Sequence, residues 1–236
     1  MTACDAFECF ENAGLKTPAI DNRLFIAYCL AVRGTDGEKA SVTADDVVNV
    51  YKNDGALLQG HFLLSSGLHS DTYLQSAKVL QNPEHAAALC AAMVAGIPAD
   101  LRQQIQCVVG PAMGAVLVSY ECGRALGLRS LFTERENGEM VLRRGFALSP
   151  GEAVLVVEDI TTTGGSTREC IAAVEAAGGK VVASSAIIDR SAGFQDFDGV
   201  PFYPLLRLPV RTWSAEACPL CAAGDVPVKP GSRGLR

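Results

Sequence analysis

Val-Leu-Val-Val-Glu-Asp-Ile-Thr-Thr-Thr-Gly-Gly-Ser-Thr, residues 154 to 167, is the stretch of sequence that decides the fold. With Ala153 it opens on a short, continuous apolar run, which is typical of a strand buried on both faces of a parallel sheet. Glu158 and Asp159 follow at the carboxyl end of this strand, where open α/β sheets bind their ligands. The stretch therefore predicts an α/β fold with a ligand site at this strand end.

A turn rich in hydroxyl groups and glycine comes directly after the two acids. It consists of Thr161, Thr162, Thr163, Gly164, Gly165, Ser166 and Thr167. Hydroxyls and flexible backbone amides of this kind can wrap an anion. Ser166 and Glu169 form a capping-box pattern, which predicts Ser166 as the N-cap of a helix. A phosphate there would meet unpaired N–H groups and the positive end of the helix dipole, so the turn is predicted to be a phosphate cradle.

Two absent motifs and one family resemblance limit which phosphate-containing ligand the cradle can bind. It contains neither the P-loop motif nor the dinucleotide motif Gly-x-Gly-x-x-Gly. Two adjacent carboxylates can hold the hydroxyls of a ribose, directly or through Mg²⁺, while the cradle holds its 5′-phosphate. The stretch resembles the phosphoribosyl pyrophosphate (PRPP) motif of the type I phosphoribosyltransferases. That resemblance implies a central, mainly parallel sheet flanked by helices, with a small N-terminal hood.

Four further segments resemble one branch of the orotate phosphoribosyltransferases. They are the hood-like Gly60 to Gln75, the mobile-loop region Phe132 to Phe146, the strand end Ile187 to Arg190, and the C-terminal Cys-Pro-Leu-Cys with Lys-Pro-Gly-Ser-Arg. Together the resemblance covers roughly residues 45 to 234. It implies transfer of a phosphoribosyl group from PRPP to orotate with Mg²⁺, giving orotidine 5′-monophosphate and pyrophosphate in pyrimidine (UMP) synthesis.

The resemblance also implies roles for individual residues. PRPP binding is implied for Glu158, Asp159, Ile160, Thr161, Thr162, Thr163, Gly164, Gly165, Ser166 and Arg135, orotate binding for Thr162 and Arg190, and a catalytic role for Arg135 and Asp159. Gly110 to Gly114 resembles the pyrophosphate loop, and Arg143 and Arg144 are further candidate cations. In this family the mobile loop crosses a dimer interface, so a homodimer that shares loop arginines is expected.

Two positions depart from the more common family pattern. Ser65 stands where the hood usually has a lysine, and Met113 and Gly114 stand where the pyrophosphate loop usually has another. Binding of the leaving group should therefore depend more on arginine and metal. Arg143 and Arg144 could instead form a solvated hairpin face, and Arg190 could simply pair with Asp189 at the surface.

Composition sets the remaining expectations. The chain has 236 residues, 49% of them hydrophobic, and a net charge of −6, which argues against a general nucleic-acid surface. The start has no leader pattern and the apolar stretch Ala86 to Ala99 is too short to span a bilayer, so a cytoplasmic protein is expected. We expect residues 1–43 to be a helical extension, 44–216 the phosphoribosyltransferase domain with its hood, and 217–236 an irregular tail.

Most of the nine cysteines are expected to be buried, reduced thiols. Cys218 and Cys221 form a single C-x-x-C pair, and a zinc site would need two more ligands. No neighbouring segment supplies them, and His61, His69 and His85 have no metal-ligand spacing. No protein metal ligand is therefore predicted; zinc shared between subunits is the alternative to a plain turn.

Two other functions remain open at this stage. A phosphoribosyltransferase for adenine, uracil or hypoxanthine would share the cradle, but a neutral base lacks a carboxylate for Arg190. A PRPP-sensing transcription regulator would add a nucleic-acid-binding domain. Residues 1–43 are short for such a domain and carry few basic residues.

Overall fold

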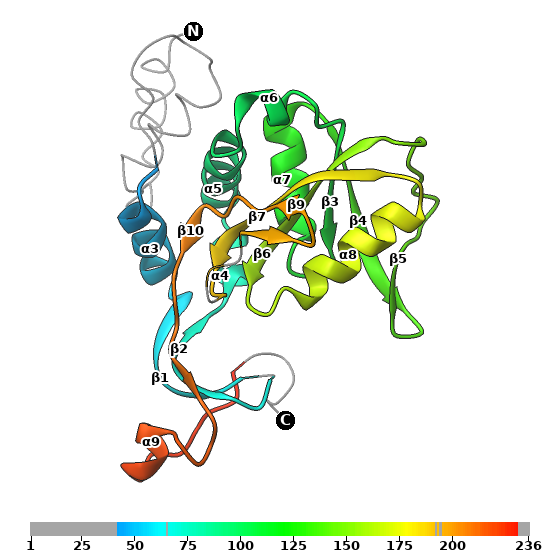
Figure 1. Ribbon diagram of the computed structural model, residues 1–236. Coiled ribbons are helices and arrows are strands. Elements are labelled where there is room, and N and C mark those ends of the chain that lie inside the picture. The colour runs from blue at the N-terminus through cyan, green and yellow to red at the C-terminus, as the bar shows by residue number, and fades with distance from the viewer. Residues whose placement is uncertain (1–41, 65, 192, 194, 231–236) are drawn as a thin grey trace, which may run out of the picture.

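The computed structural model describes residues 42–64, 66–191, 193 and 195–230 (Figure 1). Its central six-stranded sheet has the order β10-β7-β6-β3-β4-β5. The strands are β3 (Cys107–Pro111), β4 (Arg129–Glu136), β5 (Glu139–Leu142), β6 (Ala153–Thr161), β7 (Lys180–Asp189) and β10 (Leu206–Arg207). All neighbours pair in parallel except β4 and β5, which form an antiparallel hairpin. The predicted mainly parallel sheet is confirmed.

Helices cover both faces of this sheet, because alternate residues of the buried strands point to opposite sides. Leu155 and Val157 pack in one core with α5 (Pro83–Ala95) and α7 (Val116–Leu126). Val154 and Val156 pack in a second core with α8 (Gly165–Ala176). The continuous apolar run of β6 is thus explained by burial on both sides.

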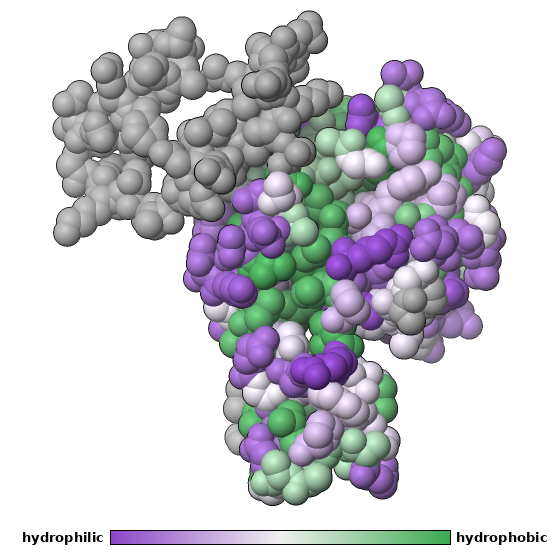
Figure 2. Space-filling model, turned by 60° about the vertical axis from the view of Figure 1, so that its left-hand side comes forward, coloured by the Kyte–Doolittle hydropathy of each residue, from purple (hydrophilic) through white to green (hydrophobic). Residues whose placement is uncertain are grey.

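The hood is a separate three-stranded sheet with the order β1-β2-β11. Its strands are β1 (Leu57–Leu63), β2 (His69–Leu74) and β11 (Thr212–Trp213). In the space-filling view it forms a distinct lobe below the main body (Figure 2). Because β11 comes from the far end of the chain, the hood joins segments that are remote in sequence. The remaining elements are α3 (Ala44–Asn53), α4 (Ser76–Leu80), α6 (Ala99–Arg102), β8 (Asp196–Phe197), β9 (Val200–Pro201) and α9 (Pro219–Ala222).

Residues 217–230 differ from the irregular tail that the sequence predicted. They contain α9 and then return to the hood, where Val228 bridges Phe62 of β1. The amide of Leu63 donates to the carbonyl of Val228 at 2.9 Å, and the amide of Val228 donates to the carbonyl of His61 at 2.8 Å. Residues 1–41, including the expected N-terminal helices, lie outside the described residues.

Two helices are bounded by the turns beside them. α3 ends at Asn53, because Gly55 adopts a left-handed conformation and the chain then enters β1. α7 begins only at Val116, after the turn that follows β3. No helix in the described part of the chain is long and apolar enough to cross a membrane.

Candidate active site

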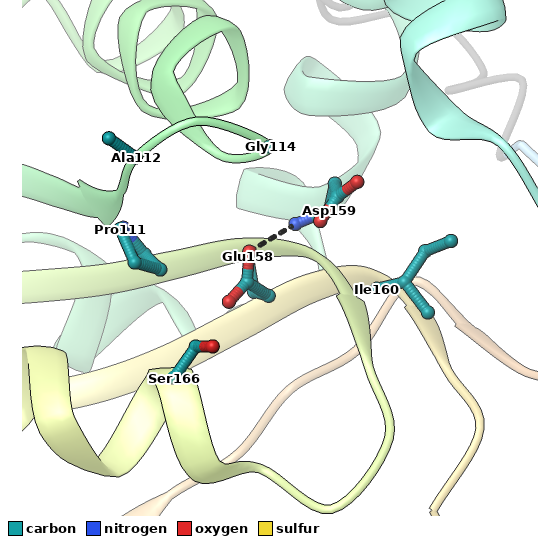
Figure 3. Close-up of a pocket in the computed structure, with 7 residues that line it drawn as sticks. All are labelled: Pro111, Ala112, Gly114, Glu158, Asp159, Ile160 and Ser166. Carbon is teal, nitrogen blue, oxygen red and sulfur yellow. Dashed lines mark hydrogen bonds between the residues drawn. The ribbon is translucent and has the colours of Figure 1, made fainter. Parts of the chain in front are cut away.

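A polar cavity of about 230 Å³ lies where β3, β6 and α8 meet at one edge of the central sheet (Figure 3). It is lined by Pro111, Ala112, Gly114, Glu158, Asp159, Ile160 and Ser166. β3 and β6 are parallel neighbours, so the loop after β3 and the two acids of β6 reach the same edge. The two predicted acids, part of the pyrophosphate-like loop and, from the cradle segment, Ile160 and Ser166 therefore share one cavity, whereas residues 161–165 are not among those that line it.

The two acids differ in their surroundings. Glu158 is 7% exposed, and burial, followed by the nearby charge of Asp159, raises the pKa of its carboxyl well above the usual range. Asp159 is half-buried, and its amide donates to Oε1 of Glu158 at 3.3 Å. Neither acid has an ion pair in the described part of the chain. The pair is therefore suited to hydroxyl donors or to a divalent cation.

The loop after β3 approaches these acids closely. A Cβ atom added at Gly114 would lie 2.9 Å from Oδ1 of Asp159, which is closer than real side chains come. The peptide bond between Ala112 and Met113 is cis, and the side chain of Met113 is 84% exposed. Glycine at position 114 thus lets backbone amides share the cavity with a carboxylate.

Because the sequence resemblance implies that PRPP binds here, we expect Gly114→Ala to raise the KM for PRPP about tenfold while the fold is kept, since the added methyl would push the loop away from Asp159. Steady-state kinetics with PRPP varied would measure this change. Gly96→Ala is the matched control, because Gly96 has φ −71° at the end of α5 and does not line the cavity, so its KM should stay at the wild-type value. A wild-type KM in Gly114→Ala would contradict a role for the loop in PRPP binding.

The cradle after β6 is built by a left-handed glycine. Gly164 has φ 73° and ψ 12°, and a side chain there would overlap the ring of Phe197. Gly164 rather than Ser166 is the N-cap of α8, and no side chain caps the helix. The prediction of Ser166 as a capping residue was therefore wrong. An uncapped N-terminus leaves backbone N–H groups available to an anion, and the chain reaches it through Thr162 and Thr163, both exposed.

One threonine of the cradle has an unused polar atom. Oγ1 of Thr161 is buried and has no hydrogen-bond partner among the described residues. A buried hydroxyl without a partner is costly, typically by about 1–3 kcal/mol.

Arg190 lies just past the end of β7, next to the cradle. Its amide donates to the carbonyl of Thr161 at 2.8 Å. The Nε of Arg190 is buried without a hydrogen-bond partner in the described chain, and burial lowers the pKa of its guanidinium. Tyr73 of the hood is close enough to influence that pKa. A half-buried guanidinium with a buried, unpaired Nε, near Tyr73 of the hood and joined to the cradle through its backbone, is suited to a carboxylate ligand.

The alternative of an ion pair between Arg190 and Asp189 is wrong. Asp189 is 1% exposed, and its carboxylate instead accepts from Nη1 of Arg207 at 2.6 Å. It also accepts from the amide of Ser191 at 2.8 Å. These contacts leave Arg190 without an acidic partner in its own strand.

The loop arginines lie outside this cavity. Arg135 lies on β4, and Arg143 and Arg144 directly follow β5. The Asn137-Gly138 turn between the two strands has positive φ at both residues, as a two-residue type I′ turn requires. Arg135 pairs with Glu169 of α8. Arg143 pairs with Glu136 at 3.1 Å and Arg144 with Glu134 at 3.0 Å. The structure therefore does not bring Arg135 to the acids and cradle within one chain.

A parallel sheet with paired acids and a glycine cradle at one strand end defines a phosphoribosyltransferase, and residues 76–200 match the family model described as a phosphoribosyl transferase domain. An orotate phosphoribosyltransferase of Acidithiobacillus ferrooxidans is 82% identical over 194 residues, which cover 82% of this chain and all of that protein. The chain belongs to the orotate phosphoribosyltransferase family, and it is an enzyme that transfers a pentosyl group.

More distant proteins agree with this assignment. An orotate phosphoribosyltransferase of Novosphingobium aromaticivorans is 54% identical over 189 residues, covering 80% of this chain and 97% of its own. The crystal structure of orotate phosphoribosyltransferase from Aeropyrum pernix superposes with a TM-score of 0.56 at 25% identity, covering 69% of this chain and 93% of its own. The fold and the family predicted from the sequence are confirmed.

Proposed function

We propose that this enzyme transfers the 5-phosphoribosyl group of PRPP to orotate, giving orotidine 5′-monophosphate and pyrophosphate in pyrimidine (UMP) synthesis. The observation that carries this proposal is the buried, unpaired Nε of Arg190 beside the cradle. Orotate carries a carboxylate that a planar guanidinium can bind through two parallel hydrogen bonds, whereas adenine, uracil and hypoxanthine do not.

Different residues of the site bind different parts of PRPP and orotate. Glu158 and Asp159 hold the ribose hydroxyls, and the backbone and hydroxyls of residues 160–166 hold the 5′-phosphate. The loop of residues 110–114 faces the pyrophosphate from the other side of the cavity. Thr162 and Arg190 bind orotate. The bond from C1′ to pyrophosphate breaks, with its electron pair leaving on pyrophosphate, and the bond to the orotate nitrogen forms, with the N–H proton released to solvent. Positive charge develops on the ribose meanwhile and is stabilised by the adjacent carboxylates.

Mg²⁺ fits this site because Glu158 and Asp159 offer oxygen ligands that no cation of the described chain neutralises. When bound, it would neutralise charge on the pyrophosphate. Arginines would supply the remaining positive charge, since the loop has Met113 and Gly114 instead of a lysine.

We further propose a homodimer in which the β4–β5 hairpin serves the partner's active site. This arrangement is supported by the position of three exposed arginines on or directly after the hairpin and outside the cavity, namely Arg135, Arg143 and Arg144. A cytoplasmic location is consistent with six described cysteines that are all unpaired.

The proposal predicts that orotate is consumed, with a fall in its ultraviolet absorbance, when the purified protein is given PRPP and Mg²⁺. Uracil, adenine and hypoxanthine should give no product under the same conditions, and omission of Mg²⁺ should abolish turnover. Turnover of another base instead of orotate would contradict the role of Arg190. Binding of PRPP without any turnover would favour a regulator that senses PRPP.

A further inference from the structure

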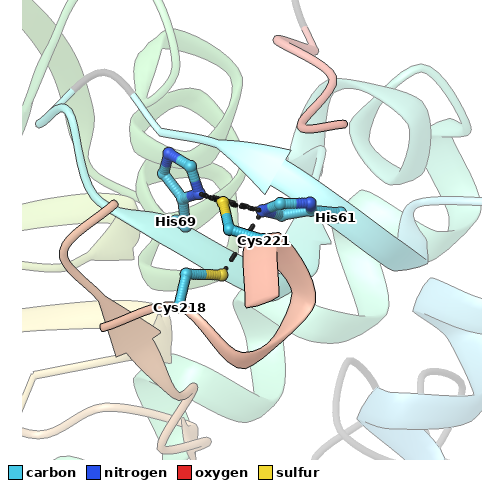
Figure 4. A group of neighbouring side chains, drawn as sticks. All are labelled: His61, His69, Cys218 and Cys221. Atoms are coloured by element: carbon cyan, nitrogen blue, oxygen red, sulfur yellow. Dashed lines mark hydrogen bonds between the residues drawn. The ribbon is translucent and has the colours of Figure 1, made fainter. Parts of the chain in front are cut away.

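Four metal-ligand side chains from opposite ends of the chain meet at the hood (Figure 4). They are His61 of β1, His69 of β2, Cys218 and Cys221. Cys218 directly precedes α9, and Cys221 lies within that helix. His61, His69 and Cys218 are buried, and Cys221 is half-buried. Both histidines lie more than 140 residues before the C-x-x-C pair, so no sequence spacing connects them with it. Only the fold brings the β1–β2 hairpin next to the two cysteines.

Three of the four distances given below fall in the range around a tetrahedral zinc ion, and the fourth, between the two histidine nitrogens, is shorter. Nε2 of His61 lies 2.9 Å from Nδ1 of His69 and 3.4 Å from Sγ of Cys218. Sγ of Cys221 lies 3.3 Å from Nδ1 of His69 and 3.7 Å from Nε2 of His61. Zinc bonds of about 2.3 Å to sulfur and 2.0 Å to nitrogen, at tetrahedral angles, place neighbouring ligands roughly 3.3–3.8 Å apart. All four atoms lie within 4.8 Å of one another.

Hydrogen bonds within the cluster do not account for this arrangement. Nδ1 of His61 lies 3.2 Å from the carbonyl oxygen of Asp225, which can only accept, so Nδ1 carries the proton. Nε2 of a neutral His61 then has one lone pair, yet His69, Cys218 and Cys221 all converge on it. A cation at the centre would use all four lone pairs at once.

The surroundings of His61 also fit a metal ligand. Histidines that bind metal commonly donate their other N–H to a carbonyl or carboxylate, which fixes the ring orientation. Here the carbonyl of Asp225 accepts from Nδ1, and Oδ2 of the same residue lies 3.7 Å away. Two thiolates would balance the charge of Zn²⁺, so the buried site as a whole would be neutral.

We propose that His61, His69, Cys218 and Cys221 bind one Zn²⁺ ion that fastens the C-terminal segment to the hood. Two cysteines and two histidines in a tetrahedral set favour zinc over harder cations such as Mg²⁺. With all four positions supplied by protein, the site is closed and structural. None of the four residues lines the cavity with Glu158 and Asp159, and α9 lies at the outer end of the hood (Figure 1).

The site would stabilise the hood from both ends of the chain. Binding through His61 and His69 would hold the β1–β2 hairpin. Binding through Cys218 and Cys221 would hold α9 and so position the chain that continues to Val228 and pairs with β1. Tyr73, which lies near Arg190, belongs to the same hairpin. Loss of the ion should therefore loosen the hood and residues 214–230 before it affects the central sheet.

Metal analysis of the full-length protein, purified without chelators from zinc-supplemented cells, tests this proposal. We expect one zinc per chain by inductively coupled plasma mass spectrometry, and a loss of most of it in Cys218→Ser and in His61→Gln. The matched controls are Cys122→Ala, a buried cysteine of α7, and His85→Gln, whose ring lies 2.7 Å from Asp54. Both controls should retain the zinc.

A measurement on the wild-type protein covers the case in which the variants do not fold. After removal of zinc by a chelator, addition of Co²⁺ should produce visible bands of a tetrahedral ion and a near-ultraviolet band from thiolate ligation. Absence of zinc together with absence of these bands would overturn the proposal. An alkylation-resistant disulfide between Cys218 and Cys221 in the purified protein would overturn it as well.

Discussion

Asp159→Asn is expected to lower kcat/KM for PRPP by about 10²- to 10³-fold while the melting temperature stays at the wild-type value. Asp159 lines the cavity beside Glu158 and touches the position that a Cβ atom of residue 114 would occupy. The amide keeps the shape of the side chain but removes its negative charge. That charge is proposed to stabilise the positive ribose ring as the bond to pyrophosphate breaks.

The fold should tolerate this change, because the charge of Asp159 is one of the causes that raise the pKa of the Glu158 carboxyl. Removing a like charge from a buried neighbour does not destabilise the folded state. Asp100→Asn, on the exposed surface of α6, makes the same chemical change away from the cavity and should leave kinetics unaltered. Full activity in Asp159→Asn would exclude Asp159 from the ribose site.

The sequence predicted the core strand and its site well because the signals there are local. A run of five apolar residues, two acids and a glycine turn are contiguous, and each feature has one physical explanation. Even so, the strand was predicted to end at Val157, whereas β6 continues to Thr161. β6 is longer than predicted because Glu158 and Ile160 pair with Ala186 and Ile188 of β7. This pairing with a neighbouring strand is a tertiary contact, and the polar residues after Val157 do not reveal it.

Features that depend on tertiary contacts were less accessible. Gly164, and not Ser166, is the helix cap, and Phe197, 33 residues further along the chain, fills the space that a side chain at position 164 would need. The cluster of His61, His69, Cys218 and Cys221 has no spacing in the sequence that identifies it. The four residues come together only because β1 pairs with β2 and the C-terminal segment returns to the same sheet, and both are tertiary contacts.

Arg190→Ala is expected to raise the KM for orotate about 100-fold and to change the KM for PRPP little. Truncating one partner of a buried, hydrogen-bonded charge pair typically costs roughly 2–5 kcal/mol, which corresponds to this loss of affinity or more. Arg190 is half-buried, its Nε is buried without a hydrogen-bond partner, and it has no acidic partner in the described chain, so the orotate carboxylate would be the group that completes it. Steady-state kinetics with each substrate varied separately would measure the two effects.

The same variant separates a binding role from a structural one. A half-buried cation with a buried, unpaired Nε does not stabilise the free protein, so Arg190→Ala should keep or raise the melting temperature measured without ligand. Orotate should then stabilise the wild type against heat but no longer stabilise the variant. Arg190→Lys retains the charge without the planar fork and should fall between the two. An equal loss for orotate and PRPP, or a lower melting temperature of the free variant, would contradict the carboxylate-binding role, because Arg190 would then be supporting the fold that both substrates share.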